Sequence, residues 1–185
     1  IVTADHGDEL FERGVIGHGA TVYEEVLRIP LIMRFPEGLG PAGLRLQTPV
    51  DLLDLAPTIL DIFGLGEADD DLALEGQSLL PVLHGAPGRP TFLGRSMHER
   101  PSYGLRDGPD KLVYDTRTGR AELYRIPEDR DETRNLAAEE PILTEYLRQS
   151  LLRKLRDLER RRGTRTDDTL SEEALEALRA LGYIE

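Results

Sequence analysis

The spacing of apolar residues changes several times along the chain, and each spacing predicts a different kind of element. Residues 1–4 are apolar or β-branched, and residues 26–35 form a nearly continuous apolar run. Such runs are typical of buried, parallel strands in a sheet that helices cover on both faces. Residues 8–13, which lie between the two runs, predict a short helix followed by a glycine-rich loop.

A helical repeat follows in residues 51–63, where apolar side chains recur every three or four positions. Pro57 falls inside this segment, so we expect a kink or a new helix start with Pro57 in its first turn. Gly64 is placed to end the helix. Residues 65–90 mix glycine, proline and acidic residues, which predicts a connection.

After residue 90 the chain changes to short segments rich in Tyr, Leu and Val. Turn residues at 106–109 and 116–119 separate these segments, so residues 91–129 predict a small antiparallel sheet. Leucines between 143 and 158 mark a long amphipathic helix, and residues 169–182 predict a last helix with a capping box at its start. These patterns place the chain in the α/β class and predict two parts.

Composition and charge narrow the range of functions. The chain has 185 residues, with 23 Lys and Arg against 35 Asp and Glu, so its formal net charge is −12. This charge argues against nonspecific binding to nucleic acid. The absence of cysteine excludes disulfides, thiolate metal ligands and a nucleophilic cysteine from this chain. No apolar run approaches the roughly 18–20 residues that cross a bilayer, so no membrane segment is expected.

The chain begins inside an apolar run and without Met, from which we expect that residues precede it in a longer parent protein. A leader would lie in those residues. The sequence therefore leaves a cytoplasmic and a periplasmic or secreted location open, and it leaves the oligomeric state open as well.

Polar side chains follow the first predicted strand. Asp5 and His6 stand where open α/β sheets place their ligands, and a carboxylate oxygen and a neutral imidazole are both metal ligands. Gly7 permits the turn that lets both side chains meet at one ion. The same residues also fit a helix-capping Asp5 and a hydrogen-bonded loop His6, so both interpretations stay open.

His18 lies between Gly17 and Gly19, on a segment that the predicted short helix folds back toward Asp5. A histidine in such a loop can protonate a leaving group or bind an anion, and an exposed loop histidine without a function is the alternative. His84 and His98 are expected to be loop or helix-end residues.

Other charged residues have structural explanations. Asp8 and Glu9 suit the dipole of the predicted short helix, and residues 23–28 are expected to form buried or half-buried structural pairs. The three aspartates at 69–71 lack the spacing of a calcium loop. The arginine-rich face of residues 148–162 is expected to be solvated.

Several short blocks occur in an order that is familiar from one family. The blocks are Thr3–Leu10, Gly17–Gly19, Tyr23–Glu25, Arg28–Ile32, Asp54–Asp61, Gly76–Pro81, Glu122–Tyr124, Glu132 with Asn135–Leu136, and Leu181–Ile184. Together they are spread across nearly the whole chain, and in this order they resemble the C-terminal part of the formylglycine-dependent sulfatases of the alkaline phosphatase superfamily.

The resemblance implies a fold and a site. The fold is the C-terminal portion of an alkaline phosphatase-like sandwich, with helices around a central mixed sheet, followed by a small antiparallel sheet and C-terminal helices. Residues 1–90 would complete the catalytic domain, and residues 91–185 would form the small-sheet subdomain. Asp5 and His6 would be ligands of a divalent cation, usually calcium, with manganese or zinc as alternatives. His18 would contact the sulfate or the leaving-group oxygen.

The resemblance also shows what this chain lacks. The family's nucleophile is a formylglycine made within a Cys/Ser-x-Pro-x-Arg motif near the N-terminus, and this chain has no such motif. We therefore expect a fragment of a metal-dependent sulfuric ester hydrolase that is inactive alone. Its substrate would be a sulfate ester of a small molecule or saccharide. The alternatives are a phosphodiesterase or phosphonate monoester hydrolase, which cleaves phosphate esters, and a non-catalytic pseudoenzyme fragment.

Overall fold

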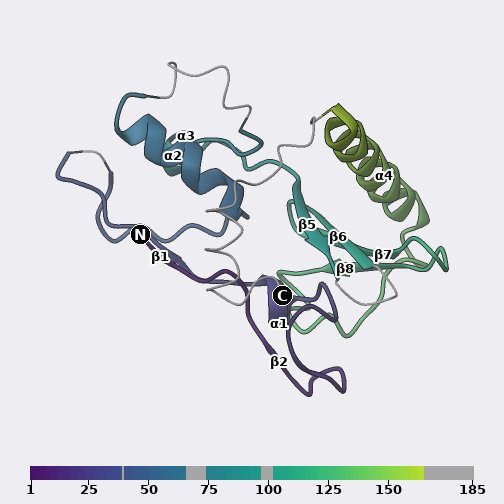
Figure 1. Cartoon of the computed structure of the whole chain (residues 1–185). Coiled ribbons are helices and arrows are strands. Elements are labelled where there is room, and N and C mark those ends of the chain that lie inside the picture. The colour runs from purple at the N-terminus through teal and green to yellow at the C-terminus, as the bar shows by residue number, and fades with distance from the viewer. Residues whose placement is uncertain (39, 66–73, 97–101, 165–185) are drawn as a thin grey trace, which may run out of the picture. The chain divides into compact units, whose positions relative to one another are not determined.

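Figure 1 shows the computed structural model of the chain, which describes residues 1–38, 40–65, 74–96 and 102–164. Residues 1–151 form one compact unit and residues 152–185 a second. The predicted helix at 169–182, the aspartates at 69–71 and His98 lie outside the described residues. The predicted division at residue 90 stays a prediction. None of the described helices has the length and apolar character that crossing a membrane requires.

The N-terminal segment forms two short antiparallel strand pairs and one helical turn. Strand β1 (Val2–Thr3) pairs with β4 (Leu31–Ile32), and β2 (Glu9–Leu10) pairs with β3 (Ile16–Gly17). Helix α1 (Glu24–Leu27) lies between β3 and β4 in the chain. All of these elements lie within the first 32 residues, which also contain the predicted site residues Asp5, His6 and His18.

Three predictions for this segment are wrong in their details. β1 runs antiparallel to β4, its described neighbour. The pair is not buried, because Val2 of β1 is 62% exposed and Ile32 of β4 is 64% exposed. Within the predicted strand at 26–35 only β4 is a strand, because the first residues of this range belong to α1. A continuous apolar run suits a buried helix as well as a strand. The predicted helix at 8–13 is a hairpin arm instead.

The interrupted helix is confirmed. The 3-10 helix η1 (Leu52–Asp54) leads into α2 (Leu55–Ile62), and Pro57 lies in the first turn of α2. Gly64 ends the helix with a φ of +68°, and the Leu65 N–H donates to the Leu60 carbonyl at 2.8 Å. These contacts form a Schellman motif, which glycine favours because it adopts the left-handed conformation without strain.

A buried carboxylate fastens this helix to the residues that follow it. Asp54 is 1% exposed and accepts hydrogen bonds from the N–H groups of Asp51 and Gln77 at 3.0 and 2.9 Å. The guanidinium of Arg89 bridges Asp51 and Asp54 at 2.7 and 2.9 Å. Burial and the nearby Asp54 charge raise the pKa of Asp51. Helix α3 (Leu80–Leu83) begins just after this region.

The small sheet and the long helix are both confirmed. The antiparallel order is β5-β6-β7-β8, and these strands span Thr91–Arg95, Ser102–Asp107, Asp110–Asp115 and Ala121–Arg125. Helix α4 (Pro141–Thr164) follows the sheet in the chain (Figure 1). Leu147 and Leu151 of α4 are buried, and the Arg148 guanidinium lies 5.9 Å from the centre of the Tyr114 ring on β7. The apolar stripe therefore marks the packed face of the helix.

Buried charges connect the N-terminal segment to this sheet. The fully buried Lys111 on β7 places its Nζ 3.0 Å from Glu24 Oε1 and 2.9 Å from Glu132 Oε1. Glu132 also accepts a hydrogen bond from the Glu24 N–H at 2.7 Å. Burial raises the pKa of Glu132, and the Lys111 charge opposes that rise. Glu24 thus forms a buried structural pair, as predicted, but its partners are distant in sequence.

Replacing Lys111 by Met is expected to lower the free energy of unfolding by about 3–5 kcal/mol, because two buried carboxylates lose their nearest counter-charge. Urea unfolding of the parent protein measures the change. Arg134→Gln is the matched control, since its pair with Glu139 at 2.7 Å is exposed and such pairs contribute about 0–1 kcal/mol. Equal losses in the two variants would show that Lys111 does not hold this region together. A second change, Glu132→Gln, should recover part of the Lys111→Met loss.

Candidate functional site

The turn after β1 is fixed by close packing against α1. The Gly7 N–H donates to the Val26 carbonyl at 2.7 Å, and a side chain on Gly7 would collide with the Glu25 carbonyl oxygen. Only glycine therefore fits at this position. The preceding residues, Asp5 and His6, are held at the point where the chain leaves β1 and turns.

Hydrogen bonds set the orientation of both predicted metal ligands. Asp5 Oδ1 accepts from the His6 N–H at 3.0 Å, and Asp5 Oδ2 lies 3.7 Å from His6 Nε2. His6 Nδ1 is 3.0 Å from the carbonyl oxygen of Gly7. Because a carbonyl oxygen only accepts hydrogen bonds, Nδ1 carries a proton and the neutral ring keeps its lone pair on Nε2.

These two donor atoms fit a shared divalent cation. Two ligands at right angles, each about 2.3–2.6 Å from a calcium ion, lie roughly 3.3–3.7 Å apart. The bond from His6 Nδ1 to a backbone carbonyl is the contact that usually orients a metal-binding histidine. The Asp5 carboxylate suits calcium or manganese, whereas the His6 imidazole suits zinc.

The β2–β3 hairpin brings His18 to the same place. The ring centres of His6 and His18 are 3.7 Å apart, with their planes at 30°. His18 Nδ1 lies 2.9 Å from Asp8 Oδ1. Donor atoms of His6, Asp8 and His18 lie within 4.8 Å of one another. The return of His18 toward His6 is as expected, although a hairpin and not a helix produces it.

Sequence reasoning missed Asp8, which it explained by the dipole of a helix that does not form. The pairing of Glu9 with Gly17 sets the hairpin register, and the next pair outward is Asp8 and His18. His84 is the C-cap of α3 and is exposed, so the helix-end interpretation of this residue is confirmed.

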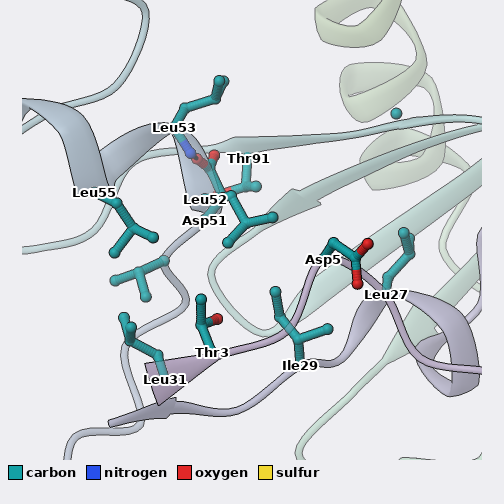
Figure 2. A pocket seen from close by; sticks show the side chains of 12 residues that line it. Thr3, Asp5, Leu27, Ile29, Leu31, Asp51, Leu52, Leu53, Leu55 and Thr91 are labelled. Atoms are coloured by element: carbon teal, nitrogen blue, oxygen red, sulfur yellow. Dashed lines mark hydrogen bonds between the residues drawn. The ribbon is translucent and has the colours of Figure 1, made fainter. Parts of the chain in front are cut away.

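Asp5 also lines a largely apolar cavity of about 300 Å³. Figure 2 shows Asp5 near Leu27 and Ile29, with Leu52 and Leu55 among the side chains that face them. Leucine and isoleucine side chains provide no hydrogen bonds for an anion. The polar side chains of the lining are those of Thr3, Asp5, Asp51 and Thr91.

Comparison with known proteins assigns the chain to a family. The family model described as "N-sulphoglucosamine sulphohydrolase, C-terminal" matches residues 18–161. Arylsulfatase K from Mus musculus is 32% identical over 165 residues, which cover 82% of this chain and 29% of that protein. Choline-sulfatase from Rhizobium meliloti is 33% identical over 137 residues, or 72% of this chain and 26% of that protein.

A solved structure agrees with these matches. The structure of BT4656 in complex with its substrate D-glucosamine-2-N,6-O-disulfate has a TM-score of 0.61 and 26% identity, and the match covers 83% of this chain and 33% of that chain. The chain spans less than a third of the length of the curated relatives it matches. The expected fold, the C-terminal portion of an alkaline phosphatase-like α/β sandwich, is confirmed. The chain therefore belongs to the sulfatases, in the family described by their N-sulphoglucosamine sulphohydrolase C-terminal region.

Proposed function

We propose that this chain is the C-terminal part of a metal-dependent sulfuric ester hydrolase. Asp5 and His6 would hold a divalent cation, with calcium as the first candidate, and His18 would contact the ester. The observation that carries the proposal is the convergence of the three side chains, with Asp5 Oδ2 3.7 Å from His6 Nε2 and the two imidazole rings 3.7 Å apart. The family match supports sulfate ester chemistry.

Each residue has a separate task in this proposal. A bound cation would supply charge that polarises the ester oxygens. Asp5 Oδ2 and His6 Nε2 would hold it, and the Gly7 carbonyl keeps the His6 ring in place. His18 Nδ1 points to Asp8, so Nε2 is the ring nitrogen that meets the ester. A proton on Nε2 would pass to the leaving alcohol oxygen as the S–O bond breaks.

The nucleophile is expected outside this chain. A formylglycine in a Cys/Ser-x-Pro-x-Arg motif would lie in the preceding part of the parent protein, which also would supply further metal ligands. The 185 residues alone should therefore release no sulfate. The BT4656 complex, whose substrate is a sulfated glucosamine, supports a sulfated saccharide as the substrate class.

The test is an assay of the parent protein with 4-nitrophenyl sulfate and a matched phosphate diester. The protein is produced together with a formylglycine-generating enzyme and measured before and after chelation. We expect sulfate release that chelation abolishes and added calcium restores, and none from the isolated 185-residue chain. A preference for the diester would move the protein to the phosphoryl-cleaving relatives. Inactivity on both esters, with no cation bound, would favour the pseudoenzyme.

A further inference from the structure

We propose that Asp8 is the positioning residue of His18. Its carboxylate holds the Nδ1 side of the His18 ring, and this contact turns Nε2 toward the place where the ester would bind. The inference rests on the proposed function, because it assumes that His18 contacts the substrate. It adds a residue to the site that the sequence motifs did not indicate.

The hairpin register is the first argument. In the β2–β3 pair Glu9 lies opposite Gly17 and Leu10 opposite Ile16, so the next cross-strand position places Asp8 beside His18. Glu9 anchors this arm because its side chain is fully buried and accepts a hydrogen bond from Thr21 Oγ1 at 2.8 Å. The backbone of Asp8 is therefore held in place by the buried Glu9 that follows it.

The conformation around His18 is the second argument. The neighbours of His18 are Gly17 and Gly19, which have φ angles of +92° and +85°. Because glycine has no side chain, neither neighbour restricts the His18 ring. Two contacts do so instead: Asp8 Oδ1 at 2.9 Å from Nδ1, and the face of the His6 ring. A ring held at one nitrogen and on one face has a defined direction for its other nitrogen.

The exposure of the pair is the third argument. The His18 side chain is 47% exposed, so a ligand can approach the ring while Asp8 holds it. The competing explanation is that Asp8 is a third ligand of the cation, since its carboxylate lies in the same cluster as His6. The two explanations differ in whether an Asp8 oxygen coordinates the cation.

The experiment compares Asp8→Ala and Asp8→Asn in the parent protein. Asparagine keeps an oxygen that accepts from Nδ1, whereas alanine does not. We expect Asp8→Ala to lower kcat/KM by ~10–10²-fold, with a larger loss for poorer leaving groups, and Asp8→Asn to lose clearly less. Calcium affinity should fall less in both variants than in a variant that lacks Asp5 and His6, because neither changes a proposed ligand. Crystal structures should show the His18 ring turned away in Asp8→Ala only.

The matched control is Glu12→Gln, which removes an exposed carboxylate from the same hairpin. Glu12 accepts from the Leu10 N–H and not from a histidine. A crystal structure of the calcium-bound parent protein in which an Asp8 oxygen coordinates the cation would identify Asp8 as a metal ligand and overturn the proposal. An unchanged His18 ring in the Asp8→Ala crystal structure would overturn it as well.

Failure of the proposed function gives a different result. If the unchanged parent protein cleaves no sulfate ester, the function fails, but the crystal structures still decide whether Asp8 orients His18. If the parent protein is active and His18→Ala is as active as the unchanged protein, then His18 has no role in the reaction. Asp8 would then hold a histidine that the reaction does not use, and the proposal would be overturned.

Discussion

Replacing Asp5 and His6 together by alanine is expected to weaken calcium binding to the parent protein by at least ~10²-fold, since even residues behind the ligands change metal affinity by 10–100-fold. Asp5 Oδ2 and His6 Nε2 are the two donor atoms that the proposal assigns to the cation, and they lie 3.7 Å apart. Loss of both would leave the cation with the ligands of the preceding part of the protein only. Sulfate release should fall with the affinity.

Isothermal titration of calcium into metal-free parent protein measures this change. The matched control is Glu139→Gln, which removes a carboxylate from an exposed pair with Arg134. Circular dichroism should be the same for the variant and the control, because Asp5 is 86% exposed and its loss opens no cavity. Equal calcium affinity in the double variant and the unchanged protein would contradict the ligand assignment.

Local signals allowed much of the fold to be predicted. Pro57 and Gly64 act through backbone requirements that depend on their immediate neighbours, so the sequence located the helix restart and its end. Gly108 and Gly119, with φ of +57° and +74°, likewise marked the turns of the small sheet. The leucine stripe of α4 specified its packed face.

The N-terminal segment was harder because its strands are set by distant pairing. β1 and β4 have two residues each and are separated by more than twenty-five positions, so periodicity within either one is too short to measure. Val2, Ile32 and Ile16 remain exposed in this chain, although their apolar character predicts burial. We expect the preceding part of the parent protein to cover them.

The residues of the candidate site likewise differ in whether a local sequence pattern indicates them. Asp5, His6 and Gly7 are adjacent, so residue type and spacing made Asp5 and His6 candidate ligands, and that role stays a prediction. Asp8 depended on the hairpin register, which a predicted helix concealed. The contact of Lys111 with Glu24 joins residues 87 positions apart, and no local pattern indicates such a pair.

Replacing His18 by alanine in the parent protein is expected to lower turnover by ~10²–10⁴-fold, which is the usual contribution of a positioned acid or base. The loss should be largest for esters with poor leaving groups, because a poor leaving alcohol depends most on receiving a proton. The ring lies 3.7 Å from that of His6, so removal of the side chain acts beside the proposed cation without removing a ligand.

A series of aryl sulfates with graded leaving groups measures this dependence, with kcat and KM determined separately. His84→Ala is the matched control, since His84 is an exposed histidine at the end of α3. A steeper dependence of kcat on the leaving group in His18→Ala than in His84→Ala would support proton donation. A uniform loss across the series would leave His18 with a binding role only, because a group that holds the sulfate affects every ester alike. Calcium affinity should be unchanged in both variants, which separates the loss of this contact from loss of the metal.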